Sequence, residues 1–292
     1  MAGRRFGYDG VEIDAKRPQA LPLDITSRAR AEIRRKLAET GIQLAAVSSY
    51  NNFIEPIREY AEMNQMLVRE QISFARELGA KVLRVFASWA MIASGKDGFG
   101  SMEQTKKWYA DRIAHLSRSQ RLDLAVSALK ELAPHAEQAG VTLALQNHPP
   151  GVQSYQDVLA ILDAVGSPAV KACIDLQNLQ PGENVRQAVL DAGKRQAHVH
   201  FGGEFRRSAA GRIECYVMDA DFPAYVKALL EIGYEGFLSF EFCHRCTQRD
   251  AQGGQASAEL AGIDRIDEQV QLARDFIEQV MVEAQGKLLA KV

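Results

Sequence analysis

Four segments of this chain end in side chains that can bind a metal ion or move a proton. They are Leu145-Gln146-Asn147-His148, Ile174-Asp175, His198-Val199-His200 and Phe240-Glu241. Each polar group follows a short run of apolar or β-branched residues, which is typical of a buried strand. Active sites of α/β barrels lie at the carboxyl ends of the strands, so we expect these side chains to meet at one end of a barrel.

The donor atoms in these segments favour a divalent cation. Carboxylates, amide oxygens and imidazoles suit Mn²⁺, Mg²⁺, Co²⁺ or Zn²⁺, and no cysteine belongs to the set. Alternation along each strand places the small residues Ala144, Cys173 and Ser239 on the same face as the donors, which leaves room for an ion and a ligand. A single polar strand end is more often a hydrogen-bonded structural group, but four in succession would each need a buried partner.

The elements that would carry these residues recur along the chain. Seven glycines each follow a helical stretch and precede a short apolar run, and glycine readily takes the left-handed conformation that ends a helix. The predicted strands are 8–13, 42–47, 82–86, 141–145, 170–174, 197–200 and 237–240, which follow Gly7, Gly41, Gly79, Gly140, Gly166, Gly193 and Gly233. This repeat predicts a (β/α)8 TIM barrel, one α/β domain over residues 1–292. A doubly wound sheet is the alternative, but no GxGxxG motif follows any strand.

The repeat contains seven strands, whereas a barrel of this type has eight. Gly7 ends a helix of which only residues 2–6 are present, so we expect the first strand to be missing or replaced. An open sheet edge invites pairing. We therefore expect another subunit, a rebuilt segment or upstream residues to cover the edge of the strand at 8–13.

Composition narrows the classes of function. The 292 residues are 47% apolar, which is enough for a packed core, and the formal net charge is −2. With no basic block and no apolar run near the ~20 residues of a membrane span, neither a nucleic acid nor a membrane is an expected partner. Four cysteines are too few for a disulfide scaffold, and no secretion signal is recognisable, so we expect a cytoplasmic protein.

From the strand at 8–13 to Glu241 and the final helix, the chain resembles the sugar phosphate isomerase/epimerase superfamily. These are the xylose-isomerase-like TIM barrels that include the ketose 3-epimerases. The resemblance implies one divalent cation, Mn²⁺ as first choice, with a ligand from each of the last four strands: Gln146, Asp175, His200 and Glu241. His200 is preferred over His198 because the family ligand commonly ends an x-V-H run. The resemblance also implies that segment 200–207 contacts a sugar through Arg206 or Arg207, and that His198 holds a hydroxyl or oxyanion.

The sequence departs from the family at Gln146, where the family has a glutamate. The family's two glutamates act as a paired acid and base, but an amide cannot accept a proton at neutral pH. A symmetric two-glutamate epimerisation is therefore not expected. His148 is the nearest replacement base to work beside Glu241, because imidazole titrates near neutral pH. A loop histidine that caps the turn at 149–151 is the alternative interpretation of His148.

Two enzymatic functions stay open. The first is an isomerase or epimerase that removes a proton next to the carbonyl of a sugar or keto-sugar. The second follows from similarity to the catalytic subunits of C-glycoside deglycosidases, which cleave 3-oxo-glycosides by metal-assisted enolisation and elimination and act with a smaller subunit. A homo-oligomer or a hetero-oligomer with such a subunit is expected. A barrel with a degraded, non-enzymatic site is the rival class, and a DNA-repair endonuclease of this superfamily would need more His and Asp ligands than this chain has.

Three further features are candidates for substrate contact or coincidence. Trp89, at the start of a long segment after the strand at 82–86, would form an apolar wall for a sugar or pack in the core. Glu12, in the strand at 8–13, would contact the substrate or be solvated. The pair Cys243 and Cys246 has CxxC spacing, but a zinc ribbon needs a second pair, so coincidence is the favoured interpretation.

Overall fold

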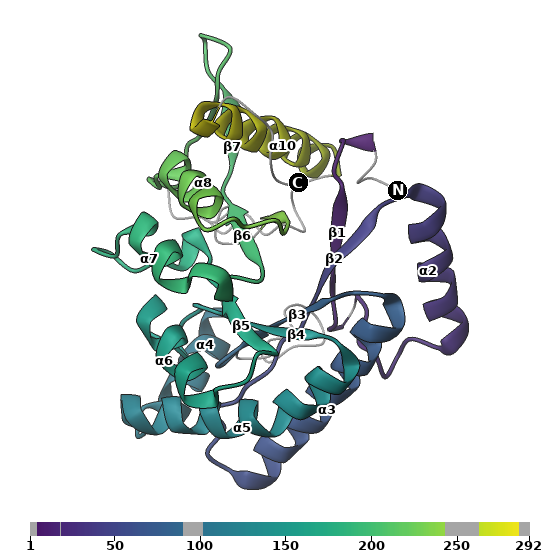
Figure 1. Ribbon diagram of the computed structural model, residues 1–292, viewed down its shortest axis with the longest axis vertical. Helices are drawn as coiled ribbons and strands as arrows, with labels where there is room; N and C mark the ends of the chain where they lie inside the picture. The colour runs from purple at the N-terminus through teal and green to yellow at the C-terminus, as the bar shows by residue number, and fades with distance from the viewer. Residues whose placement is uncertain (1–4, 18, 90–101, 243–262, 286–292) are drawn as a thin grey trace.

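In the computed structural model, strands alternate with helices, and the helices cover the outside of a barrel (Figure 1). The structure describes residues 5–17, 19–89, 102–242 and 263–285. The barrel strands are β1 (Gly10–Asp14), β2 (Gln43–Ser48), β3 (Val82–Phe86), β4 (Thr142–Gln146), β5 (Val170–Cys173), β6 (Val199–Gly202) and β9 (Leu238–Glu241). The helices are α2 (Ser27–Thr40), α3 (Arg58–Leu78), α4 (Met102–Ile113), α5 (Arg118–Ala139), α6 (Tyr155–Val165), α7 (Val185–Ala192), α8 (Phe222–Glu231) and α10 (Ile263–Gln285).

All seven predicted strands are present, and the TIM-barrel prediction is confirmed. Strands β1 to β5 form one parallel sheet in chain order, and β6 pairs in parallel with β9. A single bridge between Ala172 and Gln196 connects β5 to the segment that leads into β6. Each of the seven glycines before the strands has a positive φ, between 54° and 88°, as the helix-ending prediction requires.

Along β3 and β4, side chains alternate between the barrel interior and the helical layer. Leu83 and Val85 of β3 pack in the core beneath the helices, and so do Leu143 and Leu145 of β4. The residues between them therefore point into the barrel, Arg84 among them. Two buried apolar clusters result, one around β1–β5 with α3, α5 and α6, and one around β6, β9, α8 and α10. Because the apolar face looks outward to the helices, polar side chains are free to line the inside.

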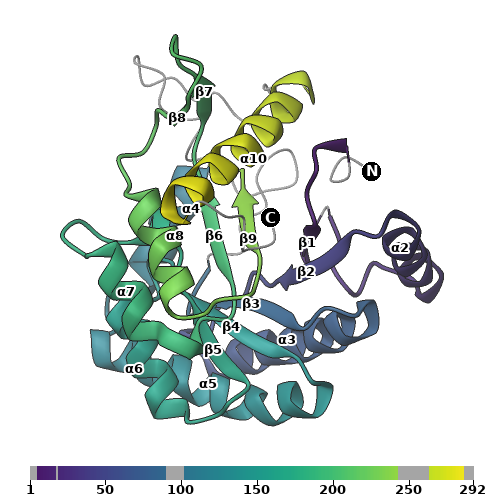
Figure 2. The same cartoon turned by 45° about the horizontal axis from the view of Figure 1, so that its top comes forward.

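Within the described residues, no hydrogen-bonded ladder joins β9 to β1, so the barrel has seven strands there and not eight. The two strands still approach each other, because a side chain at Gly10 would collide with the ring of Phe237. Helix α10 lies along the segment that precedes β1 (Figure 2): the Tyr8 hydroxyl donates to the carbonyl of Val270, and Arg274 donates to the carbonyl of Gly7. Helix α10, the last helix among the described residues, thus covers the start of β1.

Two smaller elements follow the barrel strands on the C-terminal half. A short 3-10 helix, η1 (Leu176–Asn178), comes after β5, and another, η2 (Gly193–Arg195), comes before β6. An antiparallel hairpin, β7 (Phe205–Arg207) and β8 (Ile213–Cys215), stands between β6 and α8. No helix in the described part of the chain is long and apolar enough to cross a membrane.

Candidate metal and sugar site

The predicted metal-binding side chains meet at the carboxyl ends of the strands. Gln146 ends β4, Asp175 follows β5, His200 lies within β6 and Glu241 ends β9. Val199 and Phe201 on either side of His200 pack in the outer core, so the imidazole points into the barrel. Gln146, Asp175 and His200 are almost fully buried, while the Glu241 side chain is 30% exposed, which leaves the site open on one side.

Three of these residues are spaced as ligands of one ion. Nδ1 of His200 lies 3.7 Å from Oδ2 of Asp175 and 3.6 Å from Oε2 of Glu241. These distances are too long for hydrogen bonds, but they match donors that surround an ion at about 2.1–2.2 Å. The three atoms belong to a group that fits a metal ion. The hard oxygen and imidazole donors suit the divalent cations expected from the sequence.

Gln146 contacts this group through its amide nitrogen and Arg84 through its amide oxygen. Its Nε2 donates to Oδ2 of Asp175 at 2.6 Å and lies 3.3 Å from Nδ1 of His200. Its Oε1 accepts a hydrogen bond from Arg84 at 2.9 Å. The amide therefore borders the site that the three other donors form.

Arg84 is a buried cation at the centre of the barrel, and its side chain is only 2% exposed. Besides Gln146, the guanidinium donates to Ser48 and lies 3.2 Å from Oε1 of Glu12 and 3.4 Å from Oε1 of Glu241. Burial lowers the pKa of Arg84, but the two carboxylates outweigh this effect and raise it, so the group stays charged.

Glu12 extends from β1 across the barrel to His200 of β6 and to His198, which directly precedes that strand. Its Oε2 lies 2.9 Å from Nε2 of His198 and 2.8 Å from Nε2 of His200. Burial raises the pKa of Glu12, but attraction to the two histidines and Arg84 lowers it well below its ordinary value. Glu12 is therefore an ionised carboxylate inside the barrel.

The neighbouring charges shift the other titratable groups in different directions. Burial lowers the pKa of His200, but the Glu12 carboxylate outweighs burial and raises it to about 10. Burial dominates at His198 and lowers its pKa. Burial raises the pKa of Glu241, but attraction to Arg84 and His200 outweighs burial and lowers the pKa below its ordinary value. The carboxyl group is therefore ionised at neutral pH.

Aromatic side chains flank the polar group on the side of β2 to β4. The centre of the His148 ring lies 4.4 Å from the centre of the Trp89 ring and 5.3 Å from the centre of the Phe86 ring. Both pairs are arranged edge to face. Tyr50 completes the set, with its ring 5.9 Å from Trp89 and its hydroxyl donating to Asp14. Nδ1 of His148 also contacts the carbonyl of Pro149. An apolar wall beside a polar cluster is a common way to bind a sugar ring.

Residues 2–276 match the family model described as xylose isomerase-like TIM barrel. The chain belongs to this family. As a xylose isomerase-like barrel it is similar in fold to D-psicose 3-epimerase from Clostridium cellulolyticum H10 (TM-score 0.69, 19% identity, covering 96% of this chain and 91% of that one). It is also similar to 3-keto-D-glucoside 4-epimerase from E. coli (TM-score 0.63, 19% identity, 90% and 91% covered) and to an L-ribulose 3-epimerase (TM-score 0.69, 20% identity, 98% and 88% covered). No curated protein sequence matches the chain.

Two residues predicted to contact the sugar in this xylose isomerase-like barrel lie away from the metal-binding side chains. Arg206 and Arg207 lie on the β7–β8 hairpin with side chains 64% and 57% exposed. Arg206 pairs with Glu214 across the hairpin, and Arg207 lies 3.6 Å from Asp275 of α10. Both arginines follow His200 closely in the sequence, but the hairpin turns the chain away from the barrel interior after β6. Their position in the sequence therefore did not indicate the direction of their side chains. The CxxC pair lies outside the described residues.

Arg84 and Ser48 are the site residues that the sequence argument missed in this xylose isomerase-like barrel. Both point inward, Ser48 at the end of β2 and Arg84 in the middle of β3. An arginine flanked by Val82, Leu83 and Val85 was the available signal, because a charge at an inward position of a buried strand needs partners. Arg84 lies in the middle of its strand, whereas the predicted site residues lie at or near strand ends.

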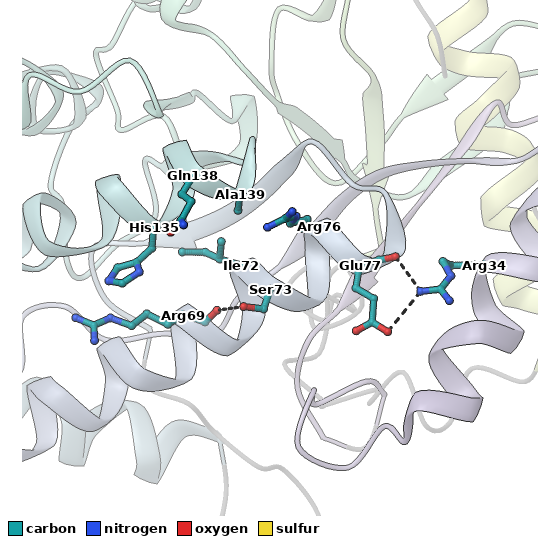
Figure 3. A pocket seen from close by; sticks show the side chains of 9 residues that line it. All are labelled: Arg34, Arg69, Ile72, Ser73, Arg76, Glu77, His135, Gln138 and Ala139. Carbon is teal, nitrogen blue, oxygen red and sulfur yellow. Dashed lines mark hydrogen bonds and ion pairs between the residues drawn. The ribbon is translucent and has the colours of Figure 1, made fainter.

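A second concave region lies outside the xylose isomerase-like barrel, between α2, α3 and α5 (Figure 3). This pocket has a volume of about 530 Å³ and is lined by charged helix residues, among them Arg34, Arg69 and Arg76. Arg34 points to Glu77, with which it forms an ion pair. None of the residues of the metal and sugar site lines this pocket.

Proposed function

We propose that this chain is a divalent-metal-dependent sugar isomerase or epimerase that removes a proton next to the carbonyl of a sugar or keto-sugar. The observation that carries the proposal is the spacing of Asp175, His200 and Glu241, whose donor atoms stand 3.6–3.7 Å apart around His200 Nδ1. Membership of the xylose isomerase-like family and the epimerase relatives named above support the choice of substrate class.

Asp175, His200 and Glu241 would hold the ion, with Gln146 as a weak fourth ligand. When bound, a divalent ion supplies Lewis acidity that polarises a substrate carbonyl. Mn²⁺ is the first choice, and Mg²⁺, Co²⁺ and Zn²⁺ share the same donor preferences. Gln146 is fully buried and its amide nitrogen already contacts Asp175 and His200, so the amide oxygen would join the ligands after a rotation of the side chain that ends its contact with Arg84.

Glu241 and His148 are the proposed proton carriers. Glu241 is ionised and partly exposed, so it can take a proton from the carbon next to the carbonyl. His148 packs edge to face against Phe86 and Trp89 and can return a proton from its imidazole. Trp89 would pack on an apolar face of the sugar, and His198 and Glu12 would approach its hydroxyls from β6 and β1.

The alternative is a lyase that cleaves a 3-oxo-glycoside by elimination. In this reaction one base removes a proton next to the carbonyl and the aglycone departs as the leaving group. Gln146 is compatible with it, because elimination needs no second carboxylate, but the relatives named above are epimerases and lend it no support. The partner subunit that this alternative implies, the oligomeric assembly and the cytoplasmic location stay predictions from the sequence.

Metal analysis and a substrate panel test the proposal together. We expect one Mn²⁺ per chain after loading, loss of activity with EDTA and recovery on adding Mn²⁺. With free ketoses and 3-keto-glycosides in D₂O, an isomerase or epimerase incorporates deuterium at the carbon next to the carbonyl and keeps the glycosidic bond. Release of an aglycone would establish the lyase instead, and activity that survives complete metal removal would contradict both.

A further inference from the structure

The carboxylate of Glu12 is surrounded by hydrogen-bond donors. Its Oε1 accepts from the Ser48 hydroxyl and lies 3.2 Å from Nε of Arg84. Its Oε2 lies 2.9 Å from Nε2 of His198 and 2.8 Å from Nε2 of His200. A single carboxylate oxygen is thus shared by two buried imidazoles, which stand edge to face with ring centres 5.0 Å apart.

The two nitrogens of His200 therefore have different surroundings. Nε2 contacts Glu12 at hydrogen-bond distance, whereas Nδ1 faces Asp175 and Glu241 at 3.7 and 3.6 Å. An imidazole binds a metal through a nitrogen that carries no proton, and the hydrogen bond at its other nitrogen decides which one that is. The acceptor at Nε2 keeps a proton there, so Nδ1 is the nitrogen whose lone pair serves the cation site when an ion binds.

We propose that Glu12 is a positioning residue, which holds the Nε2 protons of His198 and His200 and so presents Nδ1 of His200 to the metal. The metal part of this inference rests on the function proposed above, while the hydrogen bonds stand without it. Arg84 and Ser48 fix the opposite oxygen of the carboxylate, so Glu12 cannot turn away from the histidines without losing both contacts.

Glu12, His198 and His200 are also close enough to bind an ion themselves, but the lengths of their contacts favour the positioning role. These contacts are 2.8–2.9 Å, the length of ordinary hydrogen bonds, unlike the wider spacing around Nδ1 of His200.

Calorimetric titration of the full chain with Mn²⁺ tests the role of Glu12. We expect Glu12→Gln to weaken binding about 10- to 100-fold while the stoichiometry stays at one ion per chain, the usual effect of removing a carboxylate behind a metal-bound histidine. Asp14→Asn is the matched control, because Asp14 lies on the same face of β1 but accepts from the Tyr50 hydroxyl. His198→Gln removes the other imidazole. Both variants are expected to bind Mn²⁺ within about threefold of the wild type, as changes outside the ligands do.

Proton NMR of the metal-free protein, labelled at histidine, gives a readout that needs no ion. We expect the Nε2 protons of His198 and His200 to resonate downfield and exchange slowly with water, because both are buried and hydrogen-bonded. Glu12→Gln should move both signals and speed their exchange, whereas Asp14→Asn should not. If the wild type binds no Mn²⁺, the proposed function fails, and these two signals still decide the role of Glu12.

Two results would overturn the inference. One is a Glu12→Gln protein with wild-type Mn²⁺ affinity or unchanged Nε2 proton signals. The other is evidence that Glu12 and His198 are themselves metal ligands. Such evidence would be a loss of Mn²⁺ affinity in His198→Gln as large as in Glu12→Gln, or a second bound Mn²⁺ that is absent from both variants. Should Glu12→Gln fail to fold, Ser48→Ala removes one support of the carboxylate and must change Mn²⁺ affinity and the two signals in the same direction, to a smaller extent.

Discussion

The guanidinium of Arg84 lies 2.9 Å from Oε1 of Gln146, so a buried cation stands beside the amide that ends β4. The same amide donates to Asp175 at 2.6 Å. A glutamate at 146 would keep the contact with Arg84 but would set two carboxylates against each other at Asp175. An amide satisfies both neighbours, because its nitrogen donates to Asp175 and its oxygen accepts from Arg84.

Gln146→Glu is predicted to tighten metal binding and to lower native turnover. The added carboxylate supplies a charged ligand in place of an amide, and its repulsion from Asp175 is relieved only when an ion is bound. We expect Mn²⁺ affinity to rise at least about tenfold, while the extra negative charge reduces the Lewis acidity of the ion and slows the native reaction. Calorimetry and steady-state kinetics measure the two effects.

Gln138→Glu controls for the added charge, because Gln138 is exposed on α5 and borders only the outer pocket. It should leave metal affinity and turnover unchanged. Activity of Gln146→Glu on the native substrate equal to that of the wild type would show that the amide is incidental to the reaction. New epimerase activity on a free ketose would instead mean that the second carboxylate restores the paired mechanism of the family.

Arg84→Met is predicted to destabilise the metal-free protein and to bind Mn²⁺ more tightly. Without the guanidinium, the carboxylates of Glu12 and Glu241 lose their buried cation, which costs about 3–5 kcal/mol of unfolding free energy. The same loss removes a positive charge close to the metal ligands, so a divalent ion should recover part of the stability. Urea unfolding with and without Mn²⁺ measures this, and Arg84→Lys, which keeps the charge, should show a smaller effect. Equal stability of the two variants would contradict the role assigned to Arg84.

The sequence was sufficient to predict the strands but not all of the contacts between them. Glycines that end helices and period-two apolar runs are local signals, so the seven strands and the inward direction of Asp175, His200 and Glu241 followed from them. Arg84 contacts partners on four other strands, and Glu12 reaches His198 and His200 about 190 positions later in the chain. Such pairings depend on how the strands close into a barrel, which no local pattern encodes.

Metal binding is predicted to release a proton from His200. The Glu12 carboxylate raises the pKa of this imidazole to about 10, so Nδ1 is protonated in the metal-free protein at neutral pH. Mn²⁺ must displace that proton, and its affinity should therefore rise about tenfold per pH unit below the raised pKa. Calorimetry at one pH in two buffers with different ionisation enthalpies gives the number of protons released. We expect about one per ion, and a value of zero would mean that Nδ1 of His200 does not bind the metal.

The last prediction separates two sets of residues expected to hold the sugar. Trp89 lies 4.4 Å from the His148 ring, whereas Arg206 is 64% exposed and pairs with Glu214 on the hairpin. Trp89→Ala should therefore raise KM about tenfold, about 1.4 kcal/mol, which is the size of a lost aromatic contact. Arg206→Ala should leave KM unchanged, because its charge is already paired away from the cluster. Steady-state kinetics with the best substrate of the panel tests both, and circular dichroism confirms that Trp89→Ala is folded. If Arg206→Ala instead raises KM while Trp89→Ala does not, the hairpin must bend over the site when substrate binds, and the aromatic side chains serve only to pack His148.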